Sequence, residues 1–282
     1  MALSFTIWGC RGSVPAPGSD TVTYGGNTSC LAAMLDDGSV LVLDAGTGIR
    51  PLGLELVRQD TRTIHLFLTH LHLDHLEGLR FFAPLWDENV TIEFWGPRSP
   101  VLSLNDRILR AFSPPLFPLD FRDVPAHVSF HDLPGEAWRG DGVTLFSDLV
   151  LHPGPTIGFR IETAGSSLAY VPDHEPALAG IEGRSPDWLS AGGLAYRADV
   201  LLHDAQYLDE EYGERIGWGH STVDDAVAFY RAVEADRLVL FHHEPERTDR
   251  ELELLEDRAR ELAGPDRRSP VLAREGMVIE LS

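Results

Sequence analysis

One short motif constrains this chain more than any other feature. The apolar run at residues 64–69 leads directly into the sequence His-Leu-His-Leu-Asp-His at residues 70–75. Such a run is typical of a strand that is buried on both faces. Packing gives no reason for three imidazoles and a carboxylate at a strand tip, whereas together they can bind a metal ion. A polar loop rich in His is the alternative interpretation of the motif.

The composition favours one large fold with a substantial core. The chain has 282 residues, of which 43% are apolar, so we expect one large domain or two closely joined halves. The formal charge is −21, from 44 acidic and 23 basic residues. This balance argues against a surface that follows a nucleic-acid backbone, which needs clustered Lys and Arg. It permits small anionic substrates, because bound divalent cations can dominate the local field.

The cysteines and the chain start point to a cytoplasmic protein. Cys10 and Cys30 are the only two cysteines, which excludes a disulfide scaffold and suits a reducing compartment. The first residues carry neither a basic segment nor a long apolar core. No apolar stretch approaches the roughly 18 residues needed to span a bilayer. We therefore expect no contact with a membrane.

The order of predicted elements indicates two sheets with helices outside them, not a regular alternation of strands and helices. Residues 97–125 are rich in Pro and form a predicted excursion with one short helix. The predicted strands are 3–8, 28–35, 39–43, 64–69, 90–95, 128–130, 143–150, 157–162, 167–171, 200–203 and 237–242, followed by a closing hairpin at 271–281. The predicted helices are 44–57, 74–82, 101–112, 222–235 (with Ser221 as N-cap) and 249–262.

Three further candidate ligands stand at the ends of predicted strands. His152, Asp173 and His242 each follow a short apolar run and precede a turn. Strand ends are rigid enough to hold metal ligands in place. His243 is the alternative to His242, and we favour His242 because it follows Phe241 directly.

These residues suffice for two metal ions. We assign one ion to His70, His72 and His152, a second ion to Asp74, His75 and His242, and a bridging role to Asp173. Imidazole and carboxylate without thiolate favour Zn²⁺, with Mn²⁺ or iron as alternatives. Each set leaves room for water, which is typical of a catalytic site. The other histidines are expected to be structural or at the surface, namely His65, His127, His131, His174 and His203.

With this pattern the chain resembles the metallo-β-lactamase superfamily, and within it the phosphodiesterase branch. That branch contains tRNA 3′-processing endonucleases and cyclic-nucleotide or cyclic-phosphate phosphodiesterases. The resemblance covers nearly the whole chain and rests, besides the metal motif, on the segments 23–30, 43–48, 151–162 and 217–222. It implies an α/β (α+β) fold: an αββα sandwich of two mixed sheets packed face to face with helices outside. The expectation is a single domain over 1–282, with halves at about 1–150 and 151–282.

The resemblance also assigns roles outside the metal ligands. It implies that His220 contacts the scissile phosphate and helps the leaving oxygen to take a proton, with Asp204 as the acidic partner that orients it. Asp74 is expected to be needed for catalysis as well. Asp44 would orient ligands from behind. The alternatives are that His220 caps a helix and that Asp44 stabilises a helix N-terminus.

The resulting hypothesis is a dinuclear phosphodiesterase that hydrolyses a small cyclic nucleotide or cyclic phosphate by attack of a metal-bound hydroxide. Cleavage of tRNA 3′ ends is the alternative, and the negative charge disfavours tRNA as a partner. A lactone or thioester hydrolase and a catalytically silent metal-binding protein are less favoured. The resembling enzymes are often dimers, so we expect a homodimer, with residues 112–121 as the interface.

Overall fold

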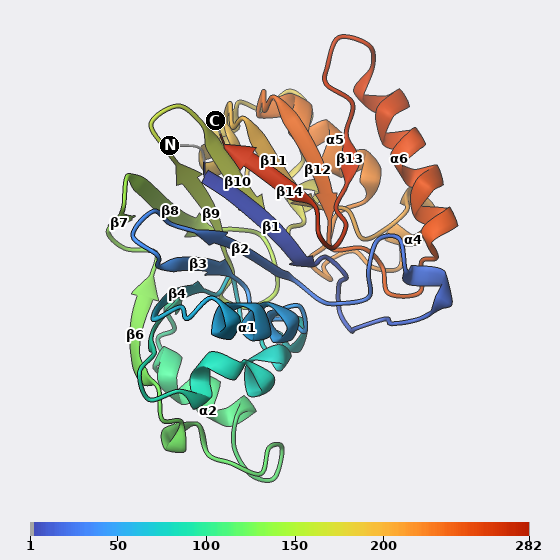
Figure 1. Cartoon of the computed structure of the whole chain (residues 1–282). Coiled ribbons are helices and arrows are strands. Elements are labelled where there is room, and N and C mark those ends of the chain that lie inside the picture. Colours follow the sequence, from blue (N-terminus) through green and yellow to red (C-terminus); the bar gives the residue numbers. More distant parts are fainter. Residues whose placement is uncertain (1–2, 282) are drawn as a thin grey trace.

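The computed structural model describes residues 3–281 and has four layers, helix, sheet, sheet and helix (Figure 1). The first sheet has the strand order β14-β1-β2-β3-β4-β5-β6, and the second has the order β13-β12-β11-β10-β9-β8-β7. Both sheets contain parallel and antiparallel pairs. The predicted αββα sandwich of two mixed sheets is therefore confirmed.

The strands agree closely with the apolar runs of the sequence. The first sheet consists of β1 (Leu3–Gly9), β2 (Cys30–Met34), β3 (Val40–Leu43), β4 (Thr63–Phe67), β5 (Thr91–Pro97), β6 (His127–Leu133) and β14 (Val278–Leu281). The second consists of β7 (Trp138–Gly140), β8 (Val143–Leu149), β9 (Ile157–Glu162), β10 (Ser167–Val171), β11 (Val200–Asp204), β12 (Arg237–Phe241) and β13 (Val271–Leu272). The short strand β7 is absent from the sequence-based prediction.

The helices cover the outer faces of the two sheets (Figure 1). They are α1 (Ile49–Arg58), α2 (Leu104–Ala111), α3 (Gly192–Ala195), α4 (Asp209–Tyr212), α5 (Val223–Ala232) and α6 (Asp249–Ala263). Buried side chains of α1 and α2 pack with those of the first sheet, and those of α5 and α6 pack with the second. None of the helices within residues 3–281 combines the length and the apolar character needed to cross a membrane.

The main core lies between the two sheets. Phe5 and Phe67 contribute to it from the first sheet, and Phe159, Tyr170 and Phe241 from the second. The rings of Phe67 and Phe159 meet edge to face with centroids 5.9 Å apart, a geometry that aromatic pairs prefer. This contact fixes how the two sheets face each other close to the ends of β4 and β10.

The predicted helix at 74–82 is wrong. The segment forms two short 3₁₀ turns, Leu73–His75 and Glu77–Phe81. The amide of Gly78 donates to the carbonyl of Ala45, 3.1 Å away, and so cannot continue a helical ladder. A Cβ at Gly78 would lie only 2.0 Å from the carbonyl oxygen of Gly46. The backbone of residues 45–46 therefore packs directly against Gly78, and this contact prevents a continuous helix over 74–82.

Two other local predictions need correction. The N-cap of α5 is Thr222, whose hydroxyl accepts from the amide of Asp225, whereas the Ser221 hydroxyl donates to the carbonyl of His174. The predicted hairpin at 271–281 is also wrong, because β13 pairs in parallel with β12 and β14 pairs antiparallel with β1. The chain therefore crosses from the second sheet to the first at its end, and Figure 1 shows β14 in red beside β1 in blue.

Candidate metal centre

The predicted site residues meet at one end of the sandwich. β10, β11 and β12 are parallel neighbours in the second sheet, so they end at a common edge. The segment after β4 of the first sheet reaches the second sheet where the Thr69 carbonyl accepts from the Ile157 amide at 2.9 Å. The segment after β4 carries the motif at residues 70–75, and the segments after β10 and β12 carry Asp173 and His242. His152 follows β8, and Asp204 ends β11. Side chains from both sheets therefore contribute to one site.

The seven candidate ligands form two groups. In each group, one ligand atom per residue lies within 4.8 Å of every other: His70, His72 and His152 form the first group, and Asp74, His75, Asp173 and His242 form the second. The sequence-based assignment differs only in placing Asp173 between the two ions rather than with the second group. Residues from both halves of the chain occur in each group.

Asp173 lies between the two groups. Its Oδ1 is 2.9 Å from His75 Nε2 and 3.4 Å from His242 Nε2, in the second group. Its Oδ2 is 3.6 Å from His70 Nε2 and 3.8 Å from His152 Nε2, in the first. One carboxylate thus presents an oxygen to each group, as the predicted bridging role requires.

The donor set fits divalent metal ions. The Nε2 atom of His70 is buried and has no hydrogen-bond partner among the described residues, and such an atom is costly unless it binds something. Imidazole nitrogens also face one another, with His72 Nδ1 3.1 Å from His152 Nε2 and His75 Nε2 3.4 Å from His242 Nε2. Nitrogen and carboxylate oxygen without thiolate suit Zn²⁺ or Mn²⁺.

Electrostatics distinguishes the two groups. Burial lowers the pKa of His70, His72 and His152, which favours the neutral imidazole that a metal ion requires. Burial raises the pKa of Asp74, but the neighbouring His75 and the hydrogen bond from His242 outweigh this effect and hold that pKa well below its ordinary value. Asp74 is therefore held ionised, as a carboxylate that binds a metal ion must be.

Asp44 holds the second group from behind, as the resemblance implies. Its carboxylate accepts hydrogen bonds from His75 Nδ1 at 2.9 Å, from the Thr69 amide at 2.8 Å and from the Tyr170 hydroxyl at 2.9 Å. The bond from Nδ1 turns Nε2 of His75 toward Asp74 and Asp173. Thr69 and Tyr170 are absent from the sequence-based prediction, although Thr69 directly precedes the motif.

Two other candidate ligands are oriented by groups that the sequence does not reveal. His152 Nδ1 donates to the carbonyl of Gly219 at 2.8 Å, and His242 Nδ1 donates to Oε1 of Gln206 at 3.2 Å. Such partners fix the tautomer and the ring plane of a metal-binding histidine. Gln206 stands two residues after the end of β11, and this position after a strand end is the signal that could have identified it.

His220 and Asp204 are in contact beside the second group. His220 Nδ1 lies 2.7 Å from Asp204 Oδ2, and the His220 ring stacks on His242 with centroids 4.9 Å apart. Burial lowers the pKa of His220, but Asp204 outweighs it and raises this pKa to about 9. Asp204 is itself fixed by the amides of His174 and Gln206. The geometry leaves Nε2 of His220 free of the Asp204 bond.

Glu175 is a further residue that sequence reasoning missed. Its buried carboxylate accepts from the amides of Gly217 at 2.8 Å and Gly219 at 2.6 Å, and from the Tyr212 hydroxyl at 2.8 Å. It therefore anchors the loop that precedes His220. Gly219 has φ +95°, and a Cβ there would lie 2.2 Å from Nδ1 of His152.

The other histidines lie outside the two groups. His243 is buried and donates to the carbonyl of Ala273 at 2.8 Å, so it points away from the site that His242 enters. His174 and His203 pair with each other at 2.8 Å beneath α5. His65 pairs with Glu93. His131 stacks on Trp95, and His127 is exposed.

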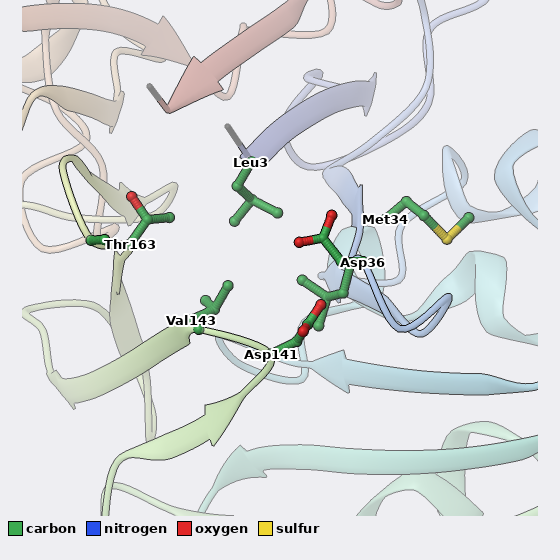
Figure 2. Close-up of a pocket in the computed structure, with 9 residues that line it drawn as sticks. Leu3, Met34, Asp36, Asp141, Val143 and Thr163 are labelled. Carbon is green, nitrogen blue, oxygen red and sulfur yellow. The ribbon is translucent and has the colours of Figure 1, made fainter. Parts of the chain in front are cut away.

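One cavity adjoins the site, and another lies far from it. A cavity of about 310 Å³ is lined by His70 and His72 together with Arg107 and Arg110 of α2. A cavity of about 270 Å³ lies at the opposite end of the strands, where β1 begins and β2 ends. Figure 2 shows Leu3, Asp36, Asp141 and Thr163 around it. It contains none of the candidate ligands.

Comparisons with known proteins agree with this geometry. The sequence profile of the family described as "Beta-lactamase superfamily domain" matches residues 40–243. A ribonuclease Z of Staphylococcus aureus is 22% identical over 262 residues, covering 77% of this chain and 82% of that protein. The short form of human tRNase Z has a TM-score of 0.67 at 22% identity and covers 99% of both chains. A diphosphatase from the PhnP family has a TM-score of 0.69 at 19% identity and covers 99% of this chain and 98% of its own.

Proposed function

The chain belongs to the metallo-β-lactamase superfamily and is a metal-dependent hydrolase, and from this premise we propose that it hydrolyses a small cyclic nucleotide or cyclic phosphate with two bound divalent ions. The observation that carries the proposal is the pair of ligand groups joined by Asp173, with the His220–Asp204 pair beside them. A site that holds two ions and a separate proton donor suits the in-line displacement of a phosphodiester.

The two groups would hold the ions as the sequence predicts. His70, His72 and His152 would hold one, Asp74, His75 and His242 the other, and Asp173 would contact both. The proposed metal is Zn²⁺, with Mn²⁺ as the alternative, because the donors are imidazole and carboxylate. When bound, the ions supply Lewis acidity, which offsets the charge of phosphate oxygens and lowers the pKa of water.

His220 is the proposed proton donor. Asp204 holds the proton on Nδ1, so the imidazolium presents its second proton at Nε2 to the leaving oxygen. Glu175 positions this step, since it fixes the loop that ends at His220. Asp74 supports it from the other side through its contact of 3.0 Å with His242, the ring on which His220 stacks.

A second candidate function is cleavage of tRNA 3′ ends. The similarity to the ribonuclease Z of Staphylococcus aureus favours it. The net charge of −21 disfavours it, and so does residue segment 97–125, which mixes arginines with aspartates. We therefore favour the small substrate over RNA.

We also propose a homodimer through residues 112–121. Leu116 and Leu119 are 68% and 45% exposed in this segment, so their apolar side chains are available for contact with a second copy. Light scattering of Leu116→Asp at several concentrations tests this proposal: a lower mass than wild type supports it, and an unchanged dimer refutes this interface.

The function is tested by a hydrolysis panel with zinc-loaded and manganese-loaded protein. The panel contains bis(p-nitrophenyl) phosphate, 3′,5′- and 2′,3′-cyclic nucleotides and a tRNA precursor. We expect turnover of a cyclic nucleotide that falls about 10²–10⁴-fold in His220→Ala, the usual contribution of a general acid. His131→Ala is the matched control, because this residue lies outside the site. Cleavage of the precursor alone would overturn the proposal in favour of the second candidate.

A further inference from the structure

The cavity beside the first ligand group has an unusual charge. Its lining includes His70 and His72, Pro153 and Pro155, and Arg107 and Arg110. The chain has 44 acidic residues against 23 basic ones, yet no Asp or Glu lines this cavity. Two arginines therefore line a space that adjoins the candidate metal centre.

The two arginines stand on one face of α2. They are three residues apart in Leu104–Ala111, a spacing that brings side chains to the same side of a helix. Arg107 is partly buried and donates to the backbone carbonyls of Pro97 and Ser103. Burial lowers the pKa of Arg107, and Asp132 offsets part of this effect. Arg107 thus anchors the segment from which the helix projects.

Arg110 has a different role from Arg107. It is exposed, and within residues 3–281 its side chain forms neither a hydrogen bond nor an ion pair. By contrast Arg122, in the same Pro-rich excursion, is paired with Asp120 at 2.8 Å. Arg110 is therefore free to bind an anion that enters the cavity.

We propose that this cavity recognises a phosphate group of the substrate other than the one that is cleaved, and that Arg110 supplies the contact. The proposal rests on the proposed function, because it places the scissile diester at the two ligand groups. Guanidinium binds phosphate through two parallel hydrogen bonds. Among the small phosphodiesters of the proposed function, the favoured substrates are then those that also carry a phosphomonoester.

The test compares two ligands that differ by one phosphate. Binding of thymidine 3′,5′-bisphosphate and of thymidine 5′-monophosphate to the zinc-loaded protein is measured by calorimetry, which requires no turnover. We expect wild type to prefer the bisphosphate and Arg110→Gln to reduce that preference about tenfold, the effect of one charge-assisted contact. Arg122→Gln removes the same charge from the same segment and should keep the preference.

The same comparison can be made in catalysis. The substrates are then the p-nitrophenyl esters of the two nucleotides, formed at the 5′-phosphate. Arg110→Gln should raise KM for the ester that carries the 3′-phosphate and leave kcat unchanged. Equal binding of both ligands to wild type, or an equal loss of preference in Arg122→Gln, would overturn the proposal. If Arg110→Gln weakened the binding of a tRNA precursor and left the preference for the bisphosphate unchanged, the proposal would be overturned in favour of a contact with the RNA backbone. Failure of the proposed function is distinguishable, because it would appear as no turnover of any cyclic nucleotide in the hydrolysis panel, whereas the binding preference is measured without turnover.

Discussion

Replacing Asp44 by Asn tests how the candidate metal centre is oriented. The carboxylate is completely buried and accepts hydrogen bonds from three residues that belong to both sheets. Its Oδ1 accepts from the amide of Thr69 at 2.8 Å, whereas its Oδ2 accepts from His75 Nδ1 and from the Tyr170 hydroxyl, both at 2.9 Å. An Asn side chain can accept at only one of these two positions.

The expected loss of stability follows from the fact that the two carboxylate oxygens accept from different donors. In either orientation the new amide group faces a buried donor, and that donor loses its acceptor. We therefore expect the free energy of unfolding of the metal-free Asp44→Asn variant to fall by about 1–3 kcal/mol. We expect zinc affinity to fall about 10–100-fold, because His75 is no longer held with Nε2 toward the site.

Urea unfolding in the presence of a chelator measures the first effect, and competition with a chromophoric chelator measures the second. Asp199→Asn is the matched control. Asp199 accepts from the amide and hydroxyl of Ser167 at 2.7 and 2.9 Å, but at the opposite end of the strands. Zinc affinity equal to wild type in a destabilised Asp44→Asn variant would refute the reasoning and leave Asp44 with a purely structural role.

Other expectations concern the proton donor, its loop, the thiols and the metal. Asp204→Asn should lower kcat about tenfold or more and leave zinc affinity unchanged, because it acts through His220; equal kcat would contradict this. Glu175→Gln should increase amide hydrogen exchange at residues 217–219, and unchanged exchange would exclude the anchoring role. Burial raises the pKa of Cys10 and Cys30 above the ordinary value of 9.0, so only the unfolded thiols ionise as the pH rises through 9. The free energy of unfolding should then fall by up to about 1.4 kcal/mol per pH unit and thiol, a slope that a double Cys→Ala variant would lose. Zinc at 100 times its Kd should stabilise wild type by about 2.7 kcal/mol over chelated protein, as a calorimetric shift of Tm would show.

The layers of the fold and the grouping of the site could be predicted because both depend on strand ends. The apolar runs are short and have clear boundaries, so β9 and β10 agree with the prediction at every residue. Because parallel strands end at one edge, Asp173 and His242 could be expected to lie near each other at the end of the second sheet. The prediction needed no knowledge of loop conformation.

The failures occur where a contact distant in sequence decides the local structure. The predicted helix at 74–82 is interrupted because Gly78 bonds to Ala45, which no periodicity within the segment reveals. Glu175 acts on amides about forty residues further along the chain, and its own neighbours give no sign of this. The pairing of β13 and β14 with different sheets likewise depends on strands at opposite ends of the chain.

The position of β14 has a consequence for biosynthesis. Since β14 pairs with β1, one side of β1 has no partner within the sheet until residues 278–281 have left the ribosome. At about 5–20 residues per second, the first strand waits for roughly 14–56 seconds with an unpaired edge. An open edge is a template for pairing with another chain. Loss of residues 278–281 would therefore leave β1 as the edge strand of the first sheet, with its backbone groups open to pairing with another chain.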